Sequence, residues 1–379
     1  MAQALRLAAR VDRRPWPNPP VGALVVRRGE VVGRGAHQGA GTLHAEIVAL
    51  REAGERARGA TLYCTLEPCN HQGRMPPCAP AVAASGIARL VIAVRDPNPL
   101  VAGGGLEVAL GAGITVTLGV GADEALDMMW PFVATCAFRR PFVWLKTATS
   151  IDGRFAPAAR AGRSPVYLTS DASRHEVHVL RRWSDVVLVG SRTVDADRPR
   201  LDTRLVTNED SCPALDPSPA VATSRTELEE GRWWARPHIV FAGSRGRAQA
   251  ATAAPATGAT VVACEDCEDG VAPASMVAGL KALGVYTLLV EGGPRLAASF
   301  LAAGLVDRWI AYTAPMVLGS GPGWPDYSPP SEGLTLTRVT RCGSDVKAVW
   351  DRVPFEATRD RLTSESAGTH AVAAPPGVA

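Results

Sequence analysis

The sequence contains no uninterrupted hydrophobic run of the length that a membrane span needs. A helix must carry about 20 consecutive apolar residues to cross a bilayer, and polar or charged residues interrupt every apolar stretch of the 379-residue chain. Residues 1–6 include a charge within their apolar stretch, which is untypical of a secretory signal. We therefore expect a cytoplasmic protein with no membrane partner.

An excess of charge of one sign is also missing. The 40 basic and 37 acidic residues leave a formal net charge of +3, which gives no support for broad binding to nucleic acid. Aromatic residues make up only 6%, and no basic stripe is interleaved with them as in proteins that stack single-stranded bases. A nucleic-acid deaminase or binding module is therefore disfavoured, and the basic residues are better explained by a small phosphorylated substrate.

Regular cysteine spacing and internal repeats are absent as well. The eight cysteines are irregularly spaced, which in a long chain favours a reducing compartment over a disulfide framework. With 46% hydrophobic and 20% charged residues, the composition is that of an ordinary soluble globular protein. The length exceeds one typical domain, so two domains are expected.

Against this background, one constellation of polar residues carries specific chemistry. His44-Ala45-Glu46 is followed by Pro68-Cys69 and then by Cys78. One imidazole and two thiols supply three zinc ligands and leave the fourth position open for a water, whose pKa the metal lowers toward neutrality. Glu46 is not needed as a ligand and can carry a proton from this water to a departing amine. The order predicts a zinc-dependent nucleobase deaminase, although the cysteines are further apart than in the short form of this motif.

Hydrophobic periodicity predicts alternating strands and helices, the layer pattern of α/β proteins. A helix at 43–57 is expected to carry His44 and Glu46 in its first turn, and a strand at 61–66 is expected to end at Cys69. The polar segment 208–236 is expected to be an exposed insertion and 355–379 a disordered tail. Further strands are expected at 21–26, 31–35, 90–94, 142–145, 185–190, 238–241, 259–263 and 286–290, and further helices at 171–183 and 296–303.

A second candidate site lies in the C-terminal half. Glu291-Gly292-Gly293-Pro294 follows an expected strand and precedes a helix. Glycines there let a phosphate approach backbone amides, and the helix N-terminus favours the anion; a tight structural turn is the alternative. The segment 190–193 follows another expected strand and favours a nucleotide crevice. No G-x-G-x-x-G lies between a strand and a helix, which argues against an ordinary Rossmann domain.

Several motifs together resemble one family. The stretch from Thr65 to Cys78, TLEPCNHQGRMPPC, resembles the zinc segment of the bifunctional riboflavin-biosynthesis deaminase-reductase family, often called RibD or RibG. The motif PNPPVGA at 17–23 and the motif DPNP at 96–99 resemble the segments on either side of it. The resemblance continues into the C-terminal half, to Glu291-Gly292-Gly293, and covers residues 1 to about 353.

This resemblance implies a fold and two reactions. It implies an α/β protein with an N-terminal cytidine-deaminase-like three-layer domain at 1–139 and a C-terminal dihydrofolate-reductase-like domain at 140–354. The first domain is expected to use Zn²⁺ to hydrolyse the exocyclic amine of a diaminopyrimidinone that carries a phosphoribosylamino group. The second is expected to reduce the ribosyl group to ribityl with NADPH, which supplies the hydride. A homo-oligomer that binds no nucleic acid is expected.

The resemblance also implies roles for individual residues. The catalytic residues would be Glu46, Lys146 and Asp152, and the zinc ligands His44, Cys69 and Cys78. Substrate contacts would come from Asn18, His71, Arg74, Asp96, Asn98, Arg181, Leu201, Arg204 and Glu291. NADPH contacts would come from Thr149, Tyr167, Thr193, Asp197, Gly293, Pro294, Arg295, Leu296, Ala297, Ala298 and Ser299.

Some of these residues also have plainer explanations. Asn18 is also explained as a turn cap, His71 as a loop histidine whose ring nitrogens are hydrogen-bonded, and Arg74 as a solvated charge. Asp96 and Asn98 are typical turn formers beside proline.

The reductase half also departs from the family pattern. Tyr167 stands where the family usually has tryptophan, Pro165 where serine is common, and Arg198 where an aspartate is usual. The alternative to the bifunctional enzyme is therefore a deaminase-only or pathway-specific paralogue with a decayed or altered reductase half.

Overall fold

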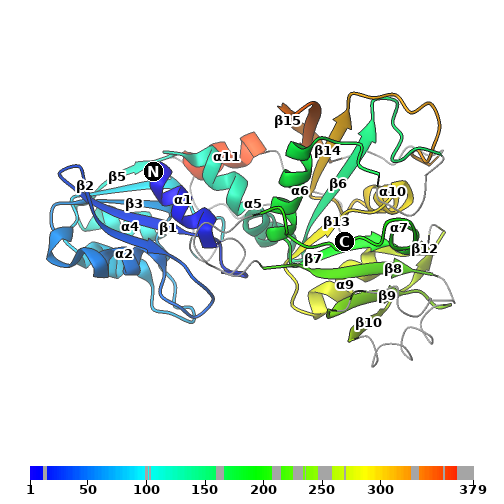
Figure 1. Cartoon of the computed structure of the whole chain (residues 1–379). Coiled ribbons are helices and arrows are strands. Elements are labelled where there is room, and N and C mark those ends of the chain that lie inside the picture. Colours follow the sequence, from blue (N-terminus) through cyan, green and yellow to red (C-terminus); the bar gives the residue numbers. More distant parts are fainter. Residues whose placement is uncertain are drawn as a thin grey trace. The chain divides into compact units, whose positions relative to one another are not determined.

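The structure is a computed structural model that divides into two compact units (Figure 1). The first unit comprises Met1–Arg139 together with Phe355–Ala379, and the second comprises Arg140–Pro354. No helix among the described residues is long and apolar enough to span a membrane. The structure describes residues 1–11, 15–98, 101, 104–158, 166–206, 215–224, 234, 236–245, 258–268, 270–325, 333–352 and 355–364.

The first unit is built on a five-stranded sheet in the order β2-β1-β3-β4-β5. Strand β1 runs antiparallel to both of its neighbours, whereas β3, β4 and β5 are parallel. The strands are β1 (Gly22–Arg27), β2 (Glu30–Ala36), β3 (Thr61–Leu66), β4 (Arg89–Val94) and β5 (Thr115–Leu118). The helices are α1 (Ala2–Val11), α2 (Ala45–Ala53), α3 (Cys78–Ala84), α4 (Gly104–Gly111), α5 (Ala122–Phe138) and α11 (Phe355–Thr363), with a 3₁₀ turn at Gly54–Ala57.

Helix α2 lies unusually close to β2 because two strand residues have no side chain. A Cβ at Gly33 would come within 2.1 Å of the Ala49 carbonyl oxygen, and a Cβ at Gly35 within 2.0 Å of the Ala45 carbonyl oxygen. Any larger residue would push the helix off the sheet. This contact fixes the start of α2, and therefore the position of His44 immediately before it.

The second unit is built on a nine-stranded sheet in the order β10-β9-β8-β7-β13-β6-β14-β16-β15. Pairing is parallel from β10 to β14 and antiparallel among β14, β16 and β15. The strands are β6 (Phe142–Ser150), β7 (Val186–Gly190), β8 (Ser218–Thr223), β9 (His238–Ala242), β10 (Ala259–Ala263), β13 (Thr287–Val290), β14 (Arg308–Ala314), β15 (Thr335–Cys342) and β16 (Asp345–Asp351). The other elements are α6 (Asp171–Arg182), α7 (Ser191–Asp197), α9 (Pro273–Ala282), α10 (Pro294–Ala302) and the hairpin β11 (Asp266–Cys267) and β12 (Gly270–Val271).

Strand β8 corrects the prediction of an exposed insertion at 208–236. It lies inside the sheet between β7 and β9, and both Ala220 and Val221 are fully buried. The sequence of this strand, SPAVAT, carries only a short apolar core, so periodicity does not reveal it. Its burial comes from parallel neighbours on both sides. Within the predicted insertion, residues 208–214, 225–233 and 235 lie outside the described residues.

The C-terminal segment also differs from the prediction. Residues 355–363, expected to belong to a disordered tail, form α11. Thr358 and Leu362 are buried, and the helix packs on α5 and β4 of the first unit. These tertiary contacts stabilise a helix whose polar sequence does not predict one. Residues 365–379 lie outside the described residues.

Candidate active sites

The three predicted zinc ligands come together in the first unit. His44 Nδ1 lies 3.4 Å from the Cys69 sulfur and 3.2 Å from the Cys78 sulfur, and the three ligand atoms all lie within 4.8 Å of one another. Cys69 follows β3 and Cys78 opens α3. His44 is the N-cap residue of α2, with an extended backbone, and does not lie in the first helical turn as predicted.

The electrostatics of this group fit a zinc ion. The hydrogen bond from the Cys78 side chain lowers the pKa of the Cys69 thiol to about 4, and the same bond raises the pKa of Cys78. The backbone N–H of Cys78 also donates to the Cys69 sulfur over 3.4 Å. An imidazole with a buried thiol and thiolate is the soft donor set that zinc prefers. The residues present therefore fit the metal.

Glu46 lies beside this group in the first turn of α2. Its side chain is buried, and burial raises the pKa of its carboxyl to about 7. A carboxyl with a pKa near neutrality can both accept and release a proton at physiological pH. The geometry therefore places a group suited to proton transfer next to the three ligands.

His37 is a buried residue of this site that the sequence prediction missed. Its Nδ1 lies 3.3 Å from the Leu43 carbonyl oxygen, which can only accept, so Nδ1 donates and Nε2 accepts. The Nε2 atom lies 3.0 Å from the side-chain amide of Asn18. The ring packs edge-on against His44, with centroids 5.0 Å apart, and burial lowers the pKa of His37. The only sequence signal is a histidine at the end of an expected strand, seven residues before His44.

The turn after β4 is anchored by a buried glutamate. The Glu67 carboxylate accepts hydrogen bonds from the backbone N–H groups of Asp96, Gly105 and Leu106 at 3.2, 3.0 and 3.1 Å. The Asp96 carboxylate accepts from the Asn98 N–H at 2.9 Å, and burial raises the pKa of Asp96 to about 7. Asp96 and Asn98 therefore do form a turn, as their residue types indicate.

The remaining two predicted substrate contacts of the first unit lie on the loop between Cys69 and Cys78. Arg74 is exposed, as a solvated charge would be, and His71 is partly exposed. The Nδ1 atom of His71 is buried and has no hydrogen-bond partner among the residues that the structure describes. The plainer explanation of His71, a loop histidine whose ring nitrogens are hydrogen-bonded, therefore does not describe this ring.

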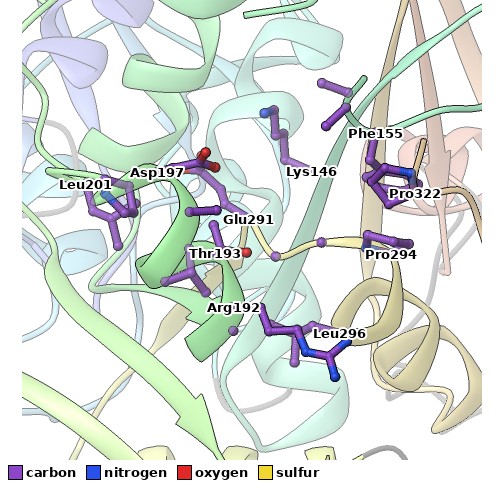
Figure 2. Close-up of a pocket in the computed structure, with 18 of the residues that line it drawn as sticks. Lys146, Phe155, Arg192, Thr193, Asp197, Leu201, Glu291, Pro294, Leu296 and Pro322 are labelled. Atoms are coloured by element: carbon purple, nitrogen blue, oxygen red, sulfur yellow. The ribbon is translucent and has the colours of Figure 1, made fainter. Parts of the chain in front are cut away.

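The second unit contains a pocket of about 1340 Å³. It lies at the carboxyl ends of the neighbouring parallel strands β7 and β13, where α7 and α10 begin, which is where α/β sheets bind ligands. Figure 2 shows side chains of separate elements around it, including Lys146 of β6, Thr193 of α7 and Glu291 after β13. The predicted residues that line it are Lys146, Tyr167, Arg181, Thr193, Asp197, Leu201, Arg204, Glu291, Gly293, Pro294, Arg295, Leu296 and Ser299.

Inside this pocket, two predicted substrate-binding residues are paired with each other. The Arg181 guanidinium forms two hydrogen bonds with the Glu291 carboxylate, at 2.6 and 2.9 Å, and a third with the Asp202 carbonyl oxygen at 3.2 Å. Lys146 is partly buried beside this pair, and desolvation lowers the pKa of its ammonium group. The pair holds each charge in a fixed orientation before any ligand arrives.

Four predicted residues do not line the pocket. Asp152 is exposed, and its carboxylate accepts hydrogen bonds from the N–H groups of Leu318 and Gly319 at 3.0 and 2.8 Å. Its role at the reaction site stays a prediction. Ala297 and Ala298 are fully buried in the core of the unit because they lie on the inner face of α10. Thr149 lies in β6, opposite Thr313 of β14.

Two of the three departures from the family pattern, Tyr167 and Arg198, line the pocket. Tyr167 is half-exposed and lines the pocket, and the Arg174 guanidinium lies 4.5 Å from its ring centroid. Arg198 caps the C-terminus of α7 in a left-handed conformation and also lines the pocket. Pro165 lies outside the described residues. An aromatic ring therefore remains available at position 167.

Two family models define the class of the protein. Residues 1–94 match the cytidine and deoxycytidylate deaminase zinc-binding region, and residues 141–348 match the RibD C-terminal domain. The chain thus joins a zinc-binding deaminase unit, which contains the group of His44, Cys69 and Cys78, to a reductase unit that contains the pocket.

Individual relatives match almost the whole chain. It is 40% identical over 323 residues to the riboflavin biosynthesis protein RibD of Aquifex aeolicus, covering 85% of this chain and 87% of that one. It is 39% identical over 338 residues to RibD of Escherichia coli, covering 84% and 88%. The solved structure of Acinetobacter baumannii RibD matches with a TM-score of 0.74 and 33% identity, covering 92% and 97%. The chain belongs to the RibD family of riboflavin biosynthesis proteins.

Proposed function

We propose that the two sites described above carry out the two consecutive reactions of this family. The chain is a bifunctional deaminase and reductase of riboflavin biosynthesis, with Zn²⁺ and NADPH as cofactors. A solved structure from Thermotoga maritima, with a TM-score of 0.72 and 29% identity over 93% of this chain, is described as a diaminohydroxyphosphoribosylaminopyrimidine deaminase and 5-amino-6-(5-phosphoribosylamino)uracil reductase. The observation that carries the assignment is a buried His-Cys-Cys-Glu group in a chain that also holds a nucleotide-sized pocket.

In the first reaction, the exocyclic amine of 2,5-diamino-6-(5-phosphoribosylamino)pyrimidin-4(3H)-one is replaced by oxygen from water, and ammonia leaves. His44, Cys69 and Cys78 would hold the zinc ion, which when bound would lower the pKa of the attacking water. Glu46 accepts a proton on its carboxylate and delivers it to the departing nitrogen. Substrate contacts come from Asn18, His71, Arg74, Asp96 and Asn98.

In the second reaction, the ribosyl group of the deaminated product is reduced to ribityl. NADPH supplies the hydride. Lys146, whose pKa burial lowers, holds the proton that balances the hydride, and the Arg181–Glu291 pair orients the sugar. Arg204 and Leu201 complete the substrate side of the pocket, and Tyr167, Thr193, Asp197, Gly293, Pro294, Arg295, Leu296 and Ser299 contact the cofactor.

The wider setting of the protein is part of the same proposal. Its partner is a small phosphorylated pyrimidine, and nucleic acid is not a ligand. The modest net charge supports this. The protein acts in the cytoplasm as a homo-oligomer.

The assay that tests this function supplies the diaminopyrimidine phosphate and NADPH to the zinc-loaded protein. Ammonia release followed by NADPH oxidation is expected. The deaminated product supplied alone isolates the second reaction. Ammonia release with no NADPH oxidation on the deaminated product would establish the alternative, a decayed or altered reductase half. Absence of both ammonia release and NADPH oxidation would overturn the whole assignment.

A further inference from the structure

The C-terminal helix α11 lies outside both matched family segments, yet it belongs to the deaminase unit. The matched segments cover residues 1–94 and 141–348, whereas α11 spans Phe355–Thr363. It packs on α5, beside which it lies in Figure 1, and on β4. It belongs to the same compact unit as His44, Cys69 and Cys78. In sequence, the reductase unit is therefore inserted between two elements of the deaminase unit.

Two side chains of α11 are buried where it packs. Thr358 is 4% exposed and Leu362 is 5% exposed. Arg359 also pairs with Asp123 in the first turn of α5, although both side chains of this ion pair are largely exposed. Exposed pairs contribute little, so the burial of Leu362 is the main side-chain contribution to docking.

A backbone hydrogen bond joins the end of α11 to the end of β4. The Arg95 N–H donates to the Leu362 carbonyl oxygen over 2.9 Å. The last pair between β4 and β5 is Ile92 with Leu118, so β4 continues beyond its neighbour. The last carbonyls of a helix have no partner within the helix, and a backbone N–H away from water needs one. The carbonyl at the end of α11 and the N–H after the end of β4 therefore supply each other's hydrogen-bond partner.

This bond acts one residue away from the predicted substrate side of the site. Arg95 directly precedes Asp96, whose own N–H donates to the Glu67 carboxylate. Glu67 in turn directly precedes Pro68 and the zinc ligand Cys69. The turn of residues 95–98 is therefore held at two points, by Glu67 from the side of the metal ligands and by Leu362 from α11.

We propose that α11 is a positioning element of the deaminase site. It holds residues 95–98 in the conformation in which Asp96 and Asn98 meet the pyrimidine. The inference rests on the proposed function, because it uses the substrate-side role of these two residues. Leu362 acts through the Arg95 backbone and is a positioning residue, since it touches neither the substrate nor the metal ligands.

The test uses the full-length, zinc-loaded protein with Leu362→Asp, which introduces a charge into the buried contact of α11. The matched control is Ala357→Asp, which introduces the same charge at an exposed position of the same helix. In Leu362→Asp, the Arg95 amide is expected to lose its protection from hydrogen exchange. The KM for deamination is expected to rise by about tenfold or more, since small displacements of positioning groups have effects of this size. Zinc content and NADPH oxidation on the deaminated product should match the wild type.

Two further variants separate positioning from a general loss of structure. Leu362→Met keeps an apolar side chain of similar volume and should restore both the exchange protection and the KM, while Leu362→Ala should give an intermediate KM if Leu362→Asp does not fold. An unchanged KM together with rapid exchange at Arg95 would overturn the inference, and so would persistent protection at Arg95 in both Leu362→Asp and Leu362→Ala. Absence of ammonia release from the wild type would instead reject the proposed deaminase function.

Discussion

The two sites of this protein are built in different ways. The group of His44, Cys69 and Cys78 in the first unit draws on three short segments, and each of these residues lies near the start of a helix or the end of a strand. The pocket of the second unit draws on residues from position 146 to position 325 and from many separate elements. A site built at the ends of a few elements can be read from local motifs, whereas a pocket exists only once the whole sheet has formed.

The sharpest way to separate the two sites is Glu46→Gln. This change keeps the size of the side chain and removes the ionisable carboxyl. Deamination is expected to fall by roughly 10²- to 10⁴-fold, the usual contribution of a general acid/base, while zinc remains bound and reduction of the deaminated product is unaffected. Ammonia release and zinc content measure the result. Normal turnover would remove Glu46 from its proposed role.

The metal ligands themselves are tested by Cys78→Ser. A hydroxyl is a poorer ligand for zinc than a thiolate, so the variant should retain much less metal and lose deamination with it. The control is Cys264→Ser, because Cys264 lies buried in the second unit and does not belong to the group of His44, Cys69 and Cys78. Elemental analysis that finds full zinc occupancy in Cys78→Ser would contradict the ligand assignment.

The second site is tested by Glu291→Gln, which leaves the buried Arg181 charge without its partner. Breaking a buried ion pair in this way should destabilise the second unit by about 3 kcal/mol and strongly reduce NADPH oxidation. Ammonia release from the diaminopyrimidine should continue. Asp171→Asn, which breaks the exposed pair with Arg174, is the control and should have little effect on denaturant midpoint or rate.

The smallest effect is expected for Asp152→Asn. The side chain is exposed, accepts hydrogen bonds from the N–H groups of Leu318 and Gly319, and is not among the residues that line the pocket. NADPH oxidation should stay within about twofold of the wild type, as for most surface substitutions. A loss of tenfold or more would show that Asp152 serves the reaction, as the resemblance to the family implies.

Much of the fold could be predicted because hydrophobic periodicity is local. Strand β3 and most helix positions agree with the predicted ranges within a few residues. The two wrong predictions, at β8 and at α11, have a common cause. Strand β8 has a weak apolar pattern, and α11 is polar, so in both cases burial against elements distant in sequence decides the structure.

In the candidate sites too, local sequence predicted some features, and contacts between distant segments decided the others. Motif order predicted the association of His44, Cys69 and Cys78, since this residue set has few uses other than zinc binding. His37 escaped prediction because its partners Asn18 and Leu43 meet it only in the folded unit. The mutual pairing of Arg181 and Glu291 was also invisible in sequence, since 110 positions separate them.

By itself, the amino-acid sequence determined which chemical groups this protein possesses and in what order, because ligand and proton-transfer chemistry depends on residue type. Only the tertiary structure decided which of those groups meet. Burial raises the pKa of Glu46, and packing between distant segments pairs Arg181 with Glu291 and brings α11 back to the end of β4. Those outcomes depend on packing between distant segments, and no local pattern records such packing.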